Sequence, residues 1–389
     1  MMNCRRRKVF ILNGLAITVV LLIVACSQAV PLSEPAAPSQ SDQQSTSELS
    51  NPEPESEPEP ESDSALDQVQ ISIQEGTPDP DIIIDVYQPD KVWAGNTLMP
   101  DNHKPGRPRV IEVNLLGEIV WEYILPQNLK KYTNPGFDAE LLPNDNILFL
   151  LPGKGVYEID RSGSVIWSYQ DKKVSHDADR LPNDNTLMVF GGNDKISDSQ
   201  VKEVNPEGEI VWKWYAKDGF NKSPYKEIFN QGWTHTNAVT RLSNGNTMIS
   251  PRNFNFIVEV DPQGAVVRTI GEGLLFSQHD PEILPGGNLL VVSQGRPHRA
   301  VEIDLKTGDI IWQFIIRDRG NLPVRDANRL PNGNTLITGS KTIVEVTRAG
   351  EIVWQLSLKG KTFDVLTEQG GMESSARGFY KAERVSMLR

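Results

Sequence analysis

The pattern that decides the fold is Leu330-Pro-Asn-Gly-Asn-Thr-Leu-Ile-Thr338, followed by Gly350-Glu-Ile-Val-Trp354. The first stretch reads as a turn followed by a short apolar strand, and the second as a turn followed by a strand that contains tryptophan. Asn-Gly tolerates the positive φ angles that tight hairpin turns need. Both turns recur along the chain, so these residues are one copy of an internal repeat.

The repeat has six copies. The first turn recurs at Ala94-Gly-Asn96, Asn144-Asp-Asn146, Asn183-Asp-Asn185, Asn244-Gly-Asn246, Gly286-Gly-Asn288 and Asn332-Gly-Asn334. The second turn recurs at Gly117, Gly163, Gly208, Gly264, Gly308 and Gly350, which are 46, 45, 56, 44 and 42 residues apart. Four short strands in a unit of about 45 residues are typical of a β-propeller blade. The sequence therefore predicts an all-β fold, a six-bladed β-propeller over residues 82–389.

Tryptophan stands four residues after five of the six glycines, and Arg268 takes its place in the fourth unit. We expect these rings to pack between neighbouring blades, since large aromatic side chains fill the space between twisted sheets. The first unit lacks the strand that precedes the first turn elsewhere, and Lys381-Ala-Glu-Arg-Val385 resembles that strand. The C-terminus is therefore predicted to supply the innermost strand of the first blade and to close the ring.

Residues 1–25 have the pattern of a lipoprotein signal peptide. A basic stretch, Arg5 to Lys8, precedes an apolar run and the box Ile23-Val-Ala-Cys26. The apolar run is shorter than the roughly 20 residues that span a bilayer. We expect cleavage and lipidation at Cys26, and hence an extracytoplasmic protein anchored in the cell membrane or an outer membrane, in the periplasm or at the cell surface. The mature chain would then have no cysteine for a disulfide or a thiolate metal site.

Residues 26–80 are predicted to be a disordered acidic linker after the lipidated cysteine, because they are rich in Ser, Pro, Glu and Gln. The whole chain carries a net charge of −12. Removing four basic residues with the signal peptide leaves 35 Lys and Arg against 51 Asp and Glu, a charge of −16. Nucleic acid is therefore not expected as a partner.

The residues that open each unit are the candidate functional residues, because innermost propeller strands line the central channel. We assign His176, His235 and His279, three of five histidines, to one repeat position, where symmetry would bring them together. Imidazole there can act as nucleophile, acid–base group or ligand; the alternative is a local role in capping each strand. The aspartate that recurs beside them is expected to bind the turn of its own blade.

Arg252 stands in Ser250-Pro-Arg252, where other repeats carry Phe, Gly or Ser. With Asn237 and the histidines it would form a cationic pocket for a sulfate, phosphate or carboxylate. An ion pair with a neighbouring aspartate is the alternative. His103 and His298 share no repeat position and are expected at the surface.

These features resemble the bacterial arylsulfate sulfotransferase family over residues 82–389. The resemblance lies in the two turn signatures, in His235-Thr-Asn237, in Ser250-Pro-Arg252 and in Ser277-Gln-His-Asp280. It implies six blades and a ping-pong transfer of a sulfuryl group from a phenolic sulfate donor to a phenol acceptor, without a nucleotide or other cofactor. His279 would become transiently sulfonated, while His176, His235, Asn237 and Arg252 would hold the sulfuryl oxygens. Long members also have an N-terminal β-domain and a disulfide, in place of which this chain has the linker and no available cysteine pair.

Three other functions remain open. A non-catalytic propeller could bind proteins or glycans at the cell surface, since the fold does not fix the function. A metal site of His176, His235 and His279 is conceivable, although the charge of Arg252 argues against it. Residues 301–312 are similar to a repeat of quinoprotein dehydrogenases, which have eight blades. The sequence identifies neither the donor and acceptor nor any protein partner.

Overall fold

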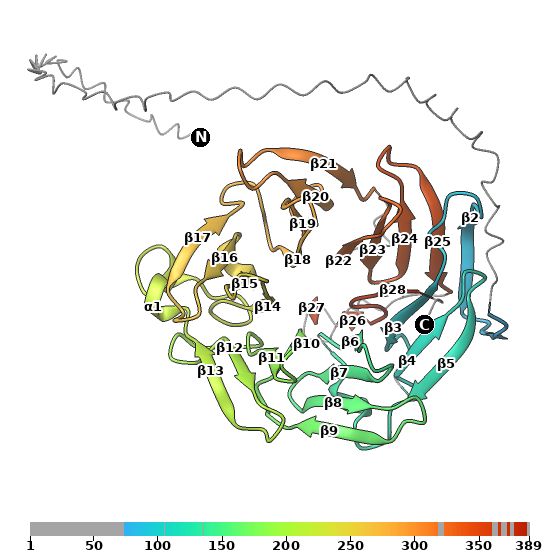
Figure 1. Cartoon of the computed structure of the whole chain (residues 1–389), viewed down its shortest axis with the longest axis horizontal. Helices are drawn as coiled ribbons and strands as arrows, with labels where there is room; N and C mark the ends of the chain where they lie inside the picture. Colours follow the sequence, from blue (N-terminus) through green and yellow to red (C-terminus); the bar gives the residue numbers. More distant parts are fainter. Residues whose placement is uncertain are drawn as a thin grey trace, which may run out of the picture. The chain divides into compact units, whose positions relative to one another are not determined.

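The computed structural model describes residues 74–104, 106–134, 136–317, 323–359, 365–366, 372–373 and 377–386. These residues form a six-bladed β-propeller around a central channel (Figure 1), as the repeat predicted. The predicted signal peptide, Cys26 and the linker as far as residue 73 lie outside the described residues. No helix in the described ranges is long and apolar enough to span a membrane.

The blades are antiparallel sheets whose strands run from the channel outward. Blade one contains β28 (Glu383–Val385), β3 (Asn96–Asp101), β4 (Arg109–Val113), β5 (Glu118–Ile124) and β1 (Thr77–Pro78). Blade two contains β6 (Asp138–Leu141), β7 (Ile147–Leu151), β8 (Gly155–Ile159) and β9 (Val165–Tyr169). Blade three contains β10 (Ala178–Arg180), β11 (Thr186–Val189), β12 (Val201–Val204) and β13 (Ile210–Trp214).

The remaining blades follow the same order. Blade four contains β14 (Thr236–Arg241), β15 (Thr247–Pro251), β16 (Ile257–Val260) and β17 (Val266–Ile270). Blade five contains β18 (His279–Ile283), β19 (Leu289–Ser293), β20 (Arg299–Ile303) and β21 (Ile310–Ile315). Blade six contains β22 (Val324–Arg329), β23 (Thr335–Gly339), β24 (Thr342–Val346), β25 (Ile352–Leu358) and β2 (Ile82–Tyr87). The short elements are η1 (Lys130–Tyr132), α1 (Lys217–Phe220), η2 (Tyr225–Glu227), η3 (Arg252–Phe254), β26 (Val365–Leu366) and β27 (Met372–Glu373).

The C-terminal strand β28 closes the ring, as predicted. Its residue Arg384 pairs with Thr97 in β3, so the last strand of the chain becomes the innermost strand of the first blade. Two N-terminal strands extend the outer edges: β1 pairs with β5 in blade one, and β2 pairs with β25 in blade six. Strand β1 lies within the range predicted as linker. The ends of the chain thus pair with both blades that flank the closure.

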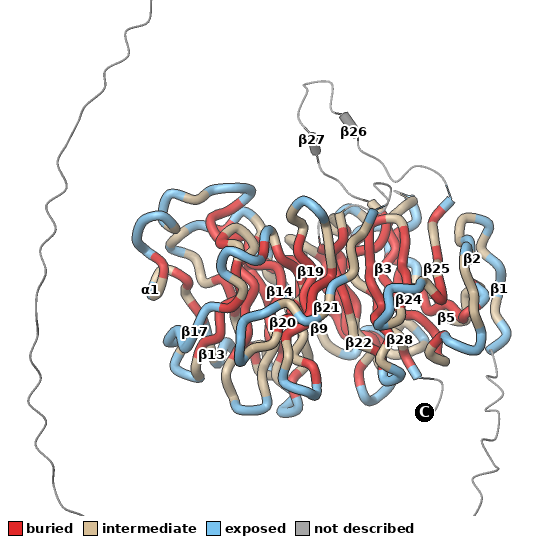
Figure 2. The backbone as a smooth tube through the Cα atoms, turned by 90° about the horizontal axis from the view of Figure 1, so that it is seen from above, coloured by how far each residue is buried: buried red, intermediate tan, exposed pale blue. Residues whose placement is uncertain are grey.

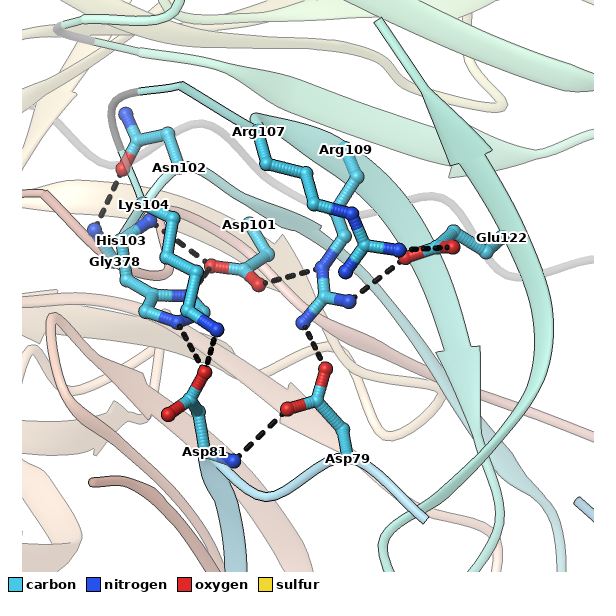
Figure 3. A network of polar contacts seen from close by, with 10 residues as sticks. All are labelled: Asp79, Asp81, Asp101, Asn102, His103, Lys104, Arg107, Arg109, Glu122 and Gly378. Carbon is cyan, nitrogen blue, oxygen red and sulfur yellow. Dashed lines mark hydrogen bonds and ion pairs between the residues drawn. The ribbon is translucent and has the colours of Figure 1, made fainter. Parts of the chain in front are cut away.

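A polar network fixes the connection between β1 and β2 to blade one (Figure 3). The guanidinium of Arg109, 1% exposed, pairs with Asp79 at 2.8 Å, Asp101 at 3.0 Å and Glu122 at 2.7 Å. Burial opposes its charge, but these carboxylates raise the pKa of Arg109. His103 bonds Asp101 and has a side chain only 9% exposed, so the prediction of a surface residue was wrong for it. Each charged side chain of the network therefore depends on the opposite charge beside it, because a buried charge without a partner lowers the stability of the fold.

The tryptophans pack between blades, as predicted. The indole N–H of each donates to a backbone carbonyl of the following blade, and a guanidinium covers each ring. The donor–acceptor pairs are Trp121–Arg161, Trp167–Pro206, Trp212–Pro262, Trp312–Arg348 and Trp354–Leu115. The covering guanidiniums belong to Arg161, Arg180, Arg241, Arg329 and Arg384, with Arg348 also over Trp312. The rings therefore join neighbouring blades through packing and hydrogen bonds.

A glutamate in the third strand of every blade binds one of these arginines. The six glutamates are Glu112, Glu158, Glu203, Glu259, Glu302 and Glu345, and each also accepts a hydrogen bond from an asparagine of the first turn. In four blades the arginine comes from the first strand of the next blade: Arg180, Arg241, Arg329 or Arg384. We call this unit the interblade latch.

The latch explains why Arg268 replaces a tryptophan. The following blade has Ile283 where an arginine would reach Glu259, and Arg268 supplies the guanidinium from within its own blade at 2.7 Å. The first blade has the same gap, because Leu141 stands at the corresponding position of β6. There Arg161 reaches Glu112 at 2.7 Å instead. Every latch glutamate therefore keeps a cationic partner.

The apolar core lies within and between the blades. The inner strands of the blades are mostly buried, and exposed residues are concentrated in the connecting loops and the outermost strands (Figure 2). The largest cluster joins blades three and four through residues such as Trp214, Phe220, Trp233, Phe254 and Phe256. It contains the long connection between β13 and β14, which explains the 56-residue spacing in this unit. This connection leads directly into the candidate site.

Candidate functional site

Six equivalent positions surround the channel where the innermost strands begin. They are defined by the strand pairing, because each stands four residues before the partner of the residue that directly follows the asparagine of the first turn. We call this set the upper ring: Phe137, His176, Asn237, His279, Arg325 and Tyr380. All six are at most 7% exposed. Phe137 packs into the core between blades one and two, while the other five bring polar groups to the channel.

His235 does not share the repeat position of the other two histidines. The register of β14 gives that position to Asn237, and His235 precedes it by two residues. The prediction of three histidines in register was therefore wrong. A β-bulge between Thr236 and Val239 shifts the register, a feature that re-aims side chains at sheet ends. The imidazole still reaches the site, since its ring centre lies 4.9 Å from that of His176.

The loop of His235 is held by Asp194, which the sequence analysis did not identify. This carboxylate is 2% exposed and accepts from the backbone N–H groups of Thr234 and His235 at 3.1 Å, and from the Thr234 hydroxyl at 2.8 Å. His235 itself has a φ of +47° and His176 a φ of +71°, a region that non-glycine residues seldom adopt. Hydrogen bonds to Asp194 offset the cost of this conformation for His235.

The tautomers of His279 and His235 follow from their contacts. Nδ1 of His279 lies 3.0 Å from the Ser277 carbonyl, and Nδ1 of His235 lies 3.0 Å from the Gln231 carbonyl. Since a carbonyl only accepts, each Nδ1 carries a proton and each neutral ring presents the lone pair of Nε2. Burial, Arg252 and Arg325 lower the pKa of His279 well below its usual value. His279 is therefore a neutral imidazole with a free nucleophilic nitrogen at neutral pH.

The other two imidazoles are also neutral. Burial and the neighbouring His235 and His279 lower the pKa of His176, and its buried Nδ1 has no hydrogen-bond partner in the described part of the chain. Burial and Arg252 lower the pKa of His235 to about 4. Asn237 donates from Nδ2 to the Gln278 carbonyl at 2.9 Å, which fixes the strand before His279. Asn237 therefore positions the nucleophile, and its Oδ1 is the atom left without a protein partner.

Two guanidiniums face these imidazoles. Arg252, at the start of η3, hydrogen bonds only to Asn253 among the described residues, at 3.5 Å, and the alternative of an ion pair with aspartate is not observed there. Arg325, which the sequence analysis gave no role, stands in the upper ring and is 7% exposed. Burial lowers the pKa of Arg325 to about 10, so it remains charged at neutral pH. The three imidazoles and two guanidiniums thus form a cationic cluster in an acidic protein.

Tyr380 completes the pocket from the C-terminal segment. Its ring centre lies 6.1 Å from that of His176 and 6.5 Å from that of His279, so the ring reaches two blades on opposite sides. The Arg325 guanidinium lies 5.2 Å above the ring. The sequence predicted the closing strand from Lys381 onward and gave no role to Tyr380, because the contacts of Tyr380 exist only once the ring has closed.

The aspartates that follow the upper ring form a second layer around Lys381. The ammonium of Lys381 lies 2.5 Å from Asp177, 2.8 Å from Asp280 and 3.6 Å from Asp138. Asp177 also accepts from the backbone N–H of Val239 at 2.6 Å, in the next blade. The prediction that these aspartates bind their own blade was therefore wrong for Asp177. A cavity of about 650 Å³ adjoins this layer on the side away from the histidines and is lined largely by carboxylates.

The described residues contain no group of three His, Cys, Asp or Glu side chains placed to hold a metal ion. The three imidazoles and two guanidiniums are instead arranged to receive an anionic group. A neutral imidazole with guanidiniums beside it suits the transfer of a group whose oxygens carry negative charge.

Comparisons with known proteins give one family match and several distantly similar structures. A search among curated proteins gives no match. Among solved structures, a protein of unknown function from Bacteroides caccae is 19% identical, covering 74% of this chain and 98% of that one with a TM-score of 0.49. Virginiamycin B lyase from Staphylococcus aureus is 14% identical, covering 70% and 88% of the two chains with a TM-score of 0.45. A family model described as arylsulfotransferase (ASST) matches residues 96–284, which run from β3 to the residue after β18. The matched range includes all five predicted site residues. The chain is therefore similar to the arylsulfotransferase family over residues 96–284.

Proposed function

We propose that the protein transfers a sulfuryl group from a phenolic sulfate to a phenol through a sulfonated His279. The observation that carries this proposal is the state of His279: a neutral buried imidazole whose Nδ1–H is bound to a carbonyl and whose Nε2 is free. The match to the arylsulfotransferase family supports phenolic substrates in general.

In the first step, Nε2 of His279 attacks sulfur, and the S–O bond to the aryl group breaks with its electron pair on the phenolic oxygen. The products are a phenolate and an N-sulfonated imidazole that keeps its Nδ1 proton. In the second step, an acceptor phenol loses its proton to solvent and its oxygen attacks the same sulfur. The N–S bond breaks with its electron pair on Nε2, which returns His279 to the neutral form. Arg252 and the one N–H of neutral His176 would stabilise the sulfuryl oxygens in both steps, whereas the Nδ1–H of His235 is already bound to the Gln231 carbonyl.

Release of 4-nitrophenolate from 4-nitrophenyl sulfate, with phenol as acceptor, tests the proposal. The full-length chain in detergent should release nitrophenolate, and His279→Ala should abolish the release. His298→Ala is the matched control, because His298 lies in the loop between β19 and β20 of the same blade and outside the upper ring. Equal rates for the wild type and His279→Ala would overturn the proposal.

We also propose that Cys26 carries a lipid and that the propeller is extracytoplasmic. The support is the sequence Ile23-Val-Ala-Cys26 after a basic and apolar N-terminus. Cells fed a labelled fatty acid should incorporate label into the wild-type chain and not into Cys26→Ser. Label in that variant would contradict lipidation at this residue.

A further inference from the structure

The proposed reaction produces two separate anionic groups in one pocket. Before transfer, the aryl sulfate carries one negative charge. Once the S–O bond has broken, the sulfonate on His279 carries one negative charge, its imidazolium ring carries one positive charge, and the departing phenolate carries a second negative charge. The following inference rests on the proposed function, and it concerns the group that receives the phenolate.

Arg325 is a buried cation that lacks an anionic partner. Its guanidinium donates to the Phe379 carbonyl at 3.2 Å and lies over Tyr380, and among the described residues it forms no ion pair with a carboxylate. A buried charge without a partner is costly, so a site that retains one is suited to bind an opposite charge. Arg252 is the second guanidinium of the site for which the described residues provide no carboxylate partner. Two guanidiniums thus match the two anionic groups that the reaction forms.

The hydroxyl of Tyr380 is also buried and has no hydrogen-bond partner in the described part of the chain. Burial raises the pKa of Tyr380, so the hydroxyl keeps its proton and can donate a hydrogen bond. The ring centre lies 6.1 Å from that of His176 and 6.5 Å from that of His279. A donor in this place would meet an oxygen attached to the sulfur that His279 attacks.

We propose that Arg325 and Tyr380 form the subsite for the phenolic oxygen of donor and acceptor. Tyr380 donates its hydroxyl hydrogen to that oxygen, and Arg325 supplies the positive charge that balances the phenolate. Arg252 then binds the sulfuryl oxygens. The subsite exists only after β28 has closed the ring, because Tyr380 and its covering cation come from blades one and six.

Binding of 4-nitrophenolate tests the subsite without catalysis. A site that favours the anion lowers the apparent pKa of bound nitrophenol, which its absorbance reports directly. The full-length chain should bind the phenolate and show this shift. Tyr380→Phe keeps the ring and loses one donor to a charged oxygen, so binding should weaken roughly tenfold to a hundredfold.

Arg325→Met should weaken phenolate binding at least as much as Tyr380→Phe. The matched control is Arg296→Met, which removes an exposed guanidinium from the loop between β19 and β20. Unchanged binding in that control would show that the loss is local. Equal losses in Arg325→Met and Arg296→Met, or no loss in Tyr380→Phe, would overturn the subsite.

Turnover separates the subsite from the proposed function. In Tyr380→Phe, kcat/KM should fall more for phenyl sulfate than for 4-nitrophenyl sulfate, because the poorer leaving group depends more on stabilisation of its oxygen. A wild type that binds nitrophenolate but transfers no sulfuryl group refutes the proposed function and leaves the subsite supported. A wild type that is active, with variants that lose equal rate on both donors, refutes the subsite alone.

Discussion

Removal of Arg384 should destabilise the propeller more than removal of any exposed latch arginine. Its guanidinium lies 3.2 Å from Glu345, both side chains are 0% exposed, and Nε donates to Thr97 at 3.0 Å. Burial lowers the pKa of Arg384 to about 10, which leaves it charged. Arg384→Met would strand the Glu345 carboxylate between blades six and one. Breaking a buried ion pair in this way costs about 3–5 kcal/mol.

The matched control is Arg268→Met. Arg268 binds the equivalent glutamate, Glu259, but its side chain is 42% exposed, and exposed pairs contribute about 0–1 kcal/mol. Urea unfolding followed by far-ultraviolet circular dichroism should therefore separate the two variants clearly. Glu345→Gln in the Arg384→Met background should recover part of the loss, because it removes the unpaired charge. Equal free energies of unfolding for the Arg384 and Arg268 variants would refute the account of ring closure.

Three further outcomes follow from the charges and contacts around the channel. Burial and Glu383 raise the pKa of Glu140 to about 8, so the free energy of unfolding falls as pH rises from about 4.3 toward that value. In urea unfolding, Glu140→Gln should match the wild type near pH 4 and be more stable at pH 8, with a difference that grows by up to about 1.4 kcal/mol per pH unit. Burial and Arg252 lower the pKa of His279, so the burst of product release in the wild type should stay level as pH falls below about 6.5. In Arg252→Met the burst should begin to fall at a higher pH than in the wild type, because His279 is protonated more readily. Gly191→Ala would place a methyl group 1.9 Å from a backbone oxygen of β14 and should reduce sulfuryl transfer and stability, whereas Gly286→Ala, which meets nothing within 4 Å, should leave both unchanged.

The repeat predicted the fold because its signals are local. Turns such as Asn332-Gly-Asn334 and tryptophans such as Trp354 each determine a short segment, and six copies leave one arrangement that buries the apolar strands. The closing strand was predictable because a unit lacked its first strand. Strands β1 and β2 were not, since they pair through backbone groups at blade edges and carry no repeat signature.

The site was predicted less completely. His176 and His279 each stand nine residues before the asparagine that ends the first turn, whereas His235 stands eleven residues before Asn246, so counting from the turn separates it from the other two. Arg325 and Tyr380 were visible as residue types, yet their importance depends on contacts across the channel between blades far apart in sequence. The latch glutamates were passed over for the same reason, because their arginines belong to the next repeat.

The most direct test of the central claim is the mass of the His279 peptide during turnover. The full-length chain should be mixed with 4-nitrophenyl sulfate without an acceptor, quenched at alkaline pH, digested and analysed by mass spectrometry. We predict one added sulfuryl group on His279, lost when phenol is supplied before quenching. An unmodified His279 peptide in a protein that releases nitrophenolate, or the modification on another residue, would contradict the account.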